Sequence, residues 1–245
     1  MKKLFGYVLI GLVLVSLVLP GCAPETTKYI VATDATWPPF EYVDEETKEI
    51  VGFDIDVMTA IAEKAGIEIE FKNVAWDPLL AGMALCQYDA AISSITITEE
   101  RKKQWLFSDP YFEAGQMVVV RIDETEITSK DDLGGKVAGA QIGTTGSFEI
   151  EKIEGATLKT YDDIGLAFQD LMNKQIDAIV ADNPLALGYV NEYPDKFKTV
   201  GGVLTEENYG IAVCKTNTDL LEKINDGLSA VIEEGLIEEL VEKWL

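Results

Sequence analysis

The chain has 245 residues, of which 47% are hydrophobic and 26% charged, so it can form one large domain or two small ones with buried cores. Its 43 acidic residues outnumber its 20 basic ones, and the formal net charge of −23 argues against nucleic acid as a partner. The sequence has no histidine and no CxxC or HExxH spacing, so histidine-based triads and zinc chemistry are excluded, and we expect no metal and no cofactor.

The N-terminus has the pattern of an export signal. Two lysines precede an apolar run over residues 4–19, which is followed by a Pro-Gly-Cys sequence at 20–22. We therefore expect a signal peptide over residues 1–21, a lipidated Cys22, and a membrane tether over residues 22–28. The alternative is an uncleaved anchor, because the run nearly reaches the roughly 20 residues of a spanning helix. In both cases the folded part is expected outside the membrane.

Strands and helices alternate along the rest of the chain. The first set is a strand at 29–32, a helix at 53–65 that ends before Gly66, and a strand at 68–73, which is the order of a parallel βαβ unit. The second set is a strand at 136–140, a helix at 161–174, a strand at 178–180, a helix at 184–192 and a helical C-terminus at 220–244.

The chain is predicted to cross twice between these sets, at the strand 116–121 and the segment 208–213. Lobe 1 then comprises residues 26–114 plus 207–245, and lobe 2 residues 115–206. The predicted fold is α/β, with two lobes that each contain a mainly parallel sheet flanked by helices. A double crossing produces a hinged cleft, and α/β sheets bind ligands at the carboxyl ends of their strands.

Polar residues follow a short strand predicted at 89–92. They offer hydroxyl and backbone donors at the expected cleft, and they are Ser93, Ser94 and Thr96. Thr98 can cap a helix that begins directly after it.

Arg101 lies in the first turn of that helix, where a basic residue is unfavourable for the helix dipole. A guanidinium beside unpaired helix N–H groups is well suited to bind a carboxylate. The alternative is a surface arginine that pairs with Glu99 or Glu100.

Several sequence motifs occur in an order typical of one protein family. They are TDATWPPFEY from Thr33, GFDIDVMTAIAEKAG, AWDPLL, TITEER, FSDPYF, GTTGS, VADN and YGIAV from Tyr209. Together they resemble the extracellular solute-binding proteins of bacterial ABC importers, in the branch that captures polar amino acids. Arginine-binding and glutamine-binding members are the most similar.

The resemblance implies a type II periplasmic-binding-protein fold with a two-strand hinge, and a binding protein rather than an enzyme. The implied partners are a free amino acid, either arginine or glutamine, and the permease of an ABC importer. The resemblance also implies a monomer outside the cytoplasm, held on the outer face of the cell membrane by its lipid or located in the periplasm.

The resemblance assigns roles to residues of lobe 1. Asp34, directly after the first strand, would meet the polar end of the ligand side chain, and its alternative is a turn-capping aspartate. Trp37 and Trp76 would flank the aliphatic stem of the ligand, because aromatic faces bury methylenes and attract cations. Both tryptophans can instead be core residues. Glu41 is expected to be only a solvated residue at a strand edge.

In lobe 2, Thr145 of the loop GTTGS would meet the ligand carboxylate from the side opposite Arg101. The loop also suggests a phosphate cradle, but the lysine of a P-loop is missing. Asp182, directly after the strand at 178–180, would hold the α-ammonium group. Its alternative is an N-cap for the following helix, a position that Asn183 can also fill.

The choice of ligand depends on Asp34 and Gln141. Glutamine-binding relatives often have a lysine at the position of Gln141, and this lysine neutralises the aspartate. Without a fixed cation, a desolvated Asp34 favours a ligand guanidinium or ammonium. The preferred ligand is therefore arginine, with lysine or histidine weaker and glutamine as the alternative. Ser93 points the same way, because glutamine-type proteins have a smaller residue there.

Two other classes of function are less well supported. The same fold carries a cyclohexadienyl or arogenate dehydratase, but an enzyme needs a positioned acid or base, and each carboxylate placed above already has a ligand-binding role. A receptor ectodomain needs a spanning segment after residue 22, and no apolar run there is long enough. Cys86 and Cys214 can pair or remain free, which the sequence does not decide.

Overall fold

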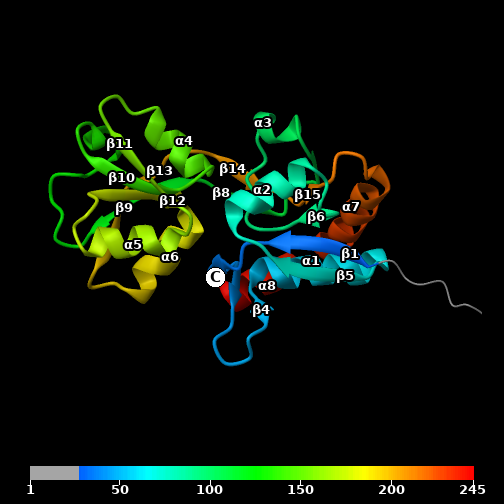
Figure 1. Ribbon diagram of the computed structural model, residues 1–245. Coiled ribbons are helices and arrows are strands. Elements are labelled where there is room, and N and C mark those ends of the chain that lie inside the picture. Colours follow the sequence, from blue (N-terminus) through cyan, green and yellow to red (C-terminus); the bar gives the residue numbers. More distant parts are fainter. Residues whose placement is uncertain (1–27) are drawn as a thin grey trace, which may run out of the picture.

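The computed structural model describes residues 28–245, so the predicted signal peptide and Cys22 lie outside the described residues. Figure 1 shows two α/β lobes side by side, with the strands β8 and β14 between them. Over residues 28–245, no helix is both long and apolar enough to cross a lipid bilayer.

The first lobe is built on a five-stranded sheet. Its order is β5 (Ile69–Asn73), β1 (Tyr29–Thr33), β6 (Ala90–Ala91), β15 (Ala212–Val213) and β7 (Leu106–Phe107). The first three strands are parallel, whereas β15 pairs antiparallel with both β6 and β7. A small antiparallel sheet of β2 (Thr36–Trp37), β3 (Glu41–Val43) and β4 (Ile50–Val51) follows β1.

Helices cover both faces of this sheet, because its strands are apolar on both sides. Val31 of β1 packs in a core with α1 (Phe53–Ala65) and α7 (Thr218–Glu233). The last helix, α8 (Leu236–Trp244), packs against both α1 and α7. Its neighbour Ala32 packs against α2 (Trp76–Ala84). The four-residue α3 (Glu99–Lys102) lies near the cleft.

The second lobe repeats this arrangement. Its sheet has the order β11 (Thr157–Tyr161), β10 (Val137–Gln141), β12 (Ala178–Asp182), β9 (Gln116–Arg121) and β13 (Phe197–Val203). Again the first three strands are parallel, and β9 pairs antiparallel with both β12 and β13. One face is covered by α4 (Thr145–Glu151) and the turn η1 (Lys130–Leu133), and the other by α5 (Ile164–Met172) and α6 (Asn183–Glu192).

The connection between the sheets is the antiparallel pair β8 (Phe112–Ala114) and β14 (Glu207–Tyr209). Phe40, Phe112 and Tyr209 pack their rings together beside it, with centroids 5.2 to 5.7 Å apart. The strand 116–121, predicted as a crossing, is instead an interior strand of the second sheet. Its uninterrupted buried residues are typical of such a strand, whereas the true crossing lies just before it.

Two helix predictions have wrong boundaries. The helix predicted at 161–174 begins at Ile164, because Asp163 caps it by accepting a hydrogen bond from Gly165 N at 2.6 Å, and Tyr161 ends an edge strand. The C-terminal helix is broken at Gly235, whose φ of 74° is left-handed, so α7 and α8 are separate helices.

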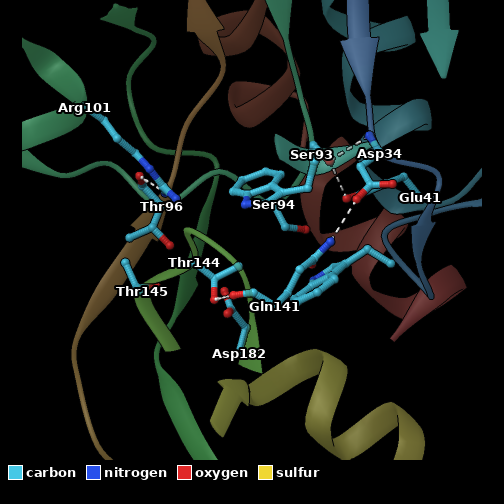
Figure 2. Close-up of a pocket in the computed structure, with 12 residues that line it drawn as sticks. Asp34, Glu41, Ser93, Ser94, Thr96, Arg101, Gln141, Thr144, Thr145 and Asp182 are labelled. Atoms are coloured by element: carbon cyan, nitrogen blue, oxygen red, sulfur yellow. Dashed lines mark hydrogen bonds between the residues drawn. The ribbon is translucent and has the colours of Figure 1, made fainter. Parts of the chain in front are cut away.

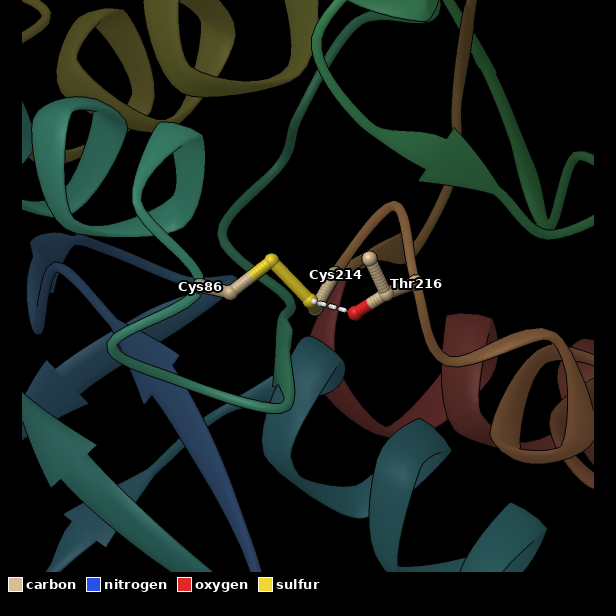
Figure 3. The surroundings of a disulfide bond; sticks show 3 residues. All are labelled: Cys86, Cys214 and Thr216. Atoms are coloured by element: carbon tan, nitrogen blue, oxygen red, sulfur yellow. Dashed lines mark hydrogen bonds between the residues drawn. A yellow bond between two sulfur atoms is a disulfide. The ribbon is translucent and has the colours of Figure 1, made fainter.

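Cys86 and Cys214 form a disulfide, which decides between the alternatives left open by the sequence (Figure 3). The bond joins the segment after α2 to the segment after β15, with a Cα–Cα distance of 5.1 Å. Both cysteines belong to the first lobe, so the disulfide braces that lobe without bridging the cleft.

Candidate functional site

A cavity lies between the two lobes (Figure 2). Its lining contains all ten residues that the sequence proposed as ligand-binding, together with Glu41 and Thr144; the ten are Asp34, Trp37, Trp76, Ser93, Ser94, Thr96, Arg101, Gln141, Thr145 and Asp182. Asp34, Gln141 and Asp182 end or directly follow the parallel strands β1, β10 and β12, and Ser93 lies two residues after β6. The carboxyl ends of both sheets therefore meet at one site.

Arg101 extends from lobe 1 towards lobe 2. The Thr98 hydroxyl caps α3 by accepting a hydrogen bond from Arg101 N at 3.1 Å. The guanidinium donates to the carbonyl oxygen of Thr96 at 2.8 Å and, across the cleft, to that of Gly143 at 3.2 Å. Its carbon atom lies 5.4 Å from the ring centroid of Trp76. Two neutral carbonyls thus hold a full positive charge in place.

The alternative of a surface arginine is wrong. Arg101 is 8% exposed, and Glu99 and Glu100 pair with Lys102 and Lys103 instead. Burial lowers the pKa of Arg101 to about 10, although the negative charges of nearby Asp182 and Glu207 oppose the shift. Among residues 28–245 no carboxylate lies within salt-bridge distance of this guanidinium.

Asp34 lies at the opposite end of the cavity (Figure 2). Its carboxylate accepts a hydrogen bond from the Thr36 hydroxyl at 3.0 Å, as a turn-capping aspartate would, and another from the Gln141 amide across the cleft at 3.1 Å. Gln141 therefore gives Asp34 a partner, but a neutral one. Burial raises the pKa of Asp34, which these two hydrogen bonds oppose.

Asp182 occupies the N-cap position of α6, yet its side chain makes no capping hydrogen bond. Instead its two oxygens accept hydrogen bonds from the Gln116 amide at 2.8 Å and the Tyr209 hydroxyl at 2.5 Å. Burial raises the pKa of Asp182 to about 6. The carboxylate is thus held facing the cavity, and the capping alternative does not apply.

Glu207 of β14 is a site residue that the sequence analysis missed. Its Oε2 atom accepts hydrogen bonds from the Thr96 hydroxyl of lobe 1 at 2.8 Å and the Thr145 hydroxyl of lobe 2 at 2.9 Å. The Gln116 amide donates to the same oxygen at 3.3 Å. Because a hydroxyl has one proton, both threonines have only lone pairs left for a ligand.

The two tryptophans are buried, Trp37 with 7% and Trp76 with 5% of its surface exposed. Neither indole N–H has a hydrogen-bond partner in the part of the chain that the structure describes. A core tryptophan usually finds such a partner. The cavity-lining hydroxyl of Ser94 is also without one over residues 28–245. These unpaired polar atoms are typical of a site that receives a polar molecule.

The expectation of a solvated Glu41 is wrong, because this residue is fully buried. The start of α1 packs tightly against the backbone beside Glu41. Asp54 N donates a hydrogen bond to the carbonyl oxygen of the preceding residue, Phe40, at 2.9 Å, and a side chain on Gly52 would come within 2.2 Å of the same oxygen. Glu41 Oε1 accepts a hydrogen bond from the Ser93 hydroxyl at 2.9 Å. Oε2 has no partner within residues 28–245.

The family model of the bacterial extracellular solute-binding proteins, family 3, matches residues 29–245. The chain belongs to this family. This solute-binding protein is 34% identical over 222 residues to the L-cystine-binding protein TcyJ of Escherichia coli (strain K12), and the match covers 90% of this chain and 83% of TcyJ.

Solved structures agree with this membership. An ancestral arginine-binding protein, solved with arginine and with glutamine, has a TM-score of 0.84 and 44% identity in both cases, covering 89% of this chain and 98% or 97% of the other. The arginine-, lysine-, histidine-binding protein ArtJ of Geobacillus stearothermophilus has a TM-score of 0.84 and 38% identity over 89% of this chain and 95% of ArtJ.

The predicted family and the type II periplasmic-binding-protein fold are thereby confirmed. The relatives are substrate-binding proteins, so this protein is a solute-binding protein and not an enzyme. The family functions outside the cytoplasm with ABC transporters, as the resemblance implied.

Proposed function

We propose that this protein binds a free amino acid outside the cytoplasm, most tightly arginine, and delivers it to the permease of an ABC importer. The observation that carries the proposal is the charge arrangement of the cavity. One end holds the buried Arg101, and the opposite end holds the buried carboxyls of Asp34 and Glu41. None of the three has a salt-bridge partner within residues 28–245, so a ligand with complementary charges at its two ends fits.

The amino acid head would lie at the Arg101 end. Its α-carboxylate would bind the guanidinium, which still has free N–H donors. Its α-ammonium would bind Asp182 and the hydroxyl oxygens of Thr96 and Thr145, which can accept because both hydroxyls donate their hydrogen bonds to Glu207. The carboxylate contact that the resemblance gives the Thr145 hydroxyl does not fit this arrangement. The head would thus contact both lobes and close them.

The ligand side chain would point towards Asp34 and Glu41. The methylenes of arginine would pack on Trp37 and Trp76, and its guanidinium would supply the positive charge that Gln141 does not. The relatives named as binding arginine support this ligand. In this proposal the protein is a monomer that is anchored to the membrane through Cys22. Its lobe 1 comprises residues 26–114 plus 207–245, and its lobe 2 comprises residues 115–206.

Glutamine is the second candidate, favoured by the unpaired indole N–H groups of Trp37 and Trp76. A glutamine side-chain carbonyl can accept from an indole, whereas a guanidinium has no acceptor. The ancestral protein solved with glutamine keeps this candidate open, and the similarity to TcyJ adds cystine to the molecules worth testing.

Calorimetric titration of the mature protein with arginine, lysine, histidine, glutamine and cystine tests the proposal. We expect arginine to bind with the lowest Kd and the other two cationic amino acids to follow. Tighter binding of glutamine or cystine than of any cationic amino acid would overturn the choice of ligand. The proposed binding of the amino acid head at the Arg101 end would remain. Absence of binding to all five would overturn the proposed function.

A further inference from the structure

Three acidic side chains converge behind the Asp34 end of the cavity. Ser93 accepts a hydrogen bond from Asp34 N at 3.0 Å and donates to Glu41 at 2.9 Å. The next residue, Ser94, donates its backbone N–H to Asp54 at 2.7 Å and has a left-handed φ of 48°. This corner of the chain brings the three carboxyls together, and Glu41 and Asp54 are fully buried.

The carboxyls of Glu41 and Asp54 have little to stabilise two negative charges. Asp54 has a neutral donor in the Tyr111 hydroxyl, 2.9 Å from each of its oxygens. Apart from its contact with Asp54, Glu41 keeps one oxygen without a partner in the described part of the chain, and this residue lines the cavity. Two buried carboxylates side by side cannot both be charged without a cation, so a proton is the simplest substitute.

The titratable groups around the pair are acidic or neutral. Asp34 faces Glu41 from the end of β1, Asp54 from the start of α1, and Tyr111 from the segment before β8. From lobe 2, Gln141 and the negative Asp163 face Asp34. Arg101 lies at the other end of the cavity (Figure 2), and the negative charges that act on it there are those of Asp182 and Glu207.

The effect of burial on the pKa values of Glu41 and Asp54 also favours a protonated pair. Burial raises the pKa of Glu41 well above the usual range, and the charge of Asp54 adds to the shift. Burial also raises the pKa of Asp54, to about 7. The protons belong to the pair rather than to either residue, because the charge of one buried carboxyl opposes ionisation of the other.

We propose that Glu41 is a ligand-binding residue and that the cationic side chain of the bound ligand displaces a proton from the Glu41–Asp54 pair. The inference rests on the proposed binding of a cationic amino acid. In the step, the O–H bond of a carboxylic acid breaks, its electron pair stays on the carboxylate, and the proton passes through water to the buffer. The new carboxylate then pairs with the ligand cation.

Two consequences distinguish this coupling from ordinary ion pairing. Arginine binding releases up to about one proton near neutral pH, whereas binding of neutral glutamine releases none. Protons compete with the cation, so arginine affinity falls as the pH is lowered through the range in which the pair titrates, which includes the Asp54 pKa of about 7, and becomes constant once the pair is ionised. Arginine itself keeps its charge over this range.

The test is calorimetric titration of the mature protein with arginine in phosphate and in Tris at the same pH between 6 and 8. The buffers differ in ionisation enthalpy, so the difference in observed heat gives the number of protons released. Glutamine, where it binds, is the neutral control on the same protein.

Two variants locate the proton. Glu41→Gln should weaken arginine binding at least tenfold and abolish the release. Asp54→Asn keeps an acceptor for Ser94 N and the Tyr111 hydroxyl and leaves Glu41 to the ligand, so it should bind arginine with a reduced release.

Each outcome has a distinct meaning. Tight arginine binding with the same heat in both buffers across this pH range overturns the coupling and leaves the proposed function intact. An equal release with glutamine also overturns it, because the proton would then come from lobe closure. Failure of all cationic amino acids to bind overturns the proposed function, and the coupling with it.

Discussion

Replacing Gln141 with lysine should convert an arginine-binding site into one that prefers glutamine. The Gln141 amide donates to Asp34 at 3.1 Å and to the carbonyl of Asp162 at 2.9 Å, so a lysine ammonium would meet the same two acceptors. Gln141 is only 2% exposed, and water would screen the new charge poorly. The introduced ammonium and the ligand guanidinium would then have to share one carboxylate.

The expected loss follows from the repulsion of the two cations. At a separation of about 4 Å and an effective dielectric constant of about 20, two unit charges repel by about 4 kcal/mol. Residual attraction of both to Asp34 and Glu41 reduces this, so we expect a loss of about 2 to 4 kcal/mol for arginine, roughly 30- to 1,000-fold in Kd. Neutral glutamine escapes this repulsion.

Calorimetric titration of Gln141→Lys with arginine and with glutamine measures this switch. The matched control is Gln141→Met, which removes the amide donor at similar length without adding a charge, and which should change both affinities by about 1 kcal/mol or less. If Gln141→Lys weakens arginine and glutamine equally, or less than Gln141→Met does, then Asp34 does not receive the ligand cation and the charge argument fails.

Four further results are expected. Arg101→Ala should lower amino acid affinity by about 3 kcal/mol or more by removing the charged partner of a buried carboxylate, and normal binding of an N-acetylated, amidated ligand would contradict the role of the site in holding a free head. Asp34→Asn should weaken arginine by about 2 to 4 kcal/mol and glutamine much less, as titrations with both will tell. Saturating ligand should compact the protein in solution scattering, whereas superposable curves would argue against closure. Replacing Cys86 and Cys214 together by serine should lower the free energy of unfolding by up to about 5 kcal/mol, because the bond closes a loop over a sequence separation of 128, and an unchanged denaturation midpoint would refute this.

Local sequence located the strand ends that line the cavity, whereas the roles proposed for the residues there came from the family resemblance. Asp34, Gln141 and Asp182 each end or directly follow a strand whose apolar residues identify it, and parallel strands present these ends at one edge. The position of Arg101 was also readable, because a basic residue in the first turn of a helix needs a compensating partner.

Glu41 and Glu207 were missed because their environment is made by distant segments. Glu41 begins a short strand flanked by aromatic residues, and alternation predicts that it faces water. The start of α1 packs against the backbone of Phe40 and Glu41, a contact that depends on Gly52, whose φ of 136° favours glycine. Glu207 meets Thr145 across 62 positions of sequence, which no local pattern indicates.

The same unpaired charges link ligand choice to lobe closure. The closed cleft buries Arg101 at one end and Asp34 at the other, and the groups that reach these two charges across the cleft are neutral, the Gly143 carbonyl for Arg101 and the Gln141 amide for Asp34. Burying such charges without a partner is costly, so closure of the empty cleft is disfavoured relative to an open form in which water reaches them. A ligand with a carboxylate at one end and a cation at the other removes both costs at once, and a ligand that lacks either charge removes only one. A protein that closes on its ligand should therefore discriminate between ligands with both charges and ligands with only one more strongly than either lobe could alone.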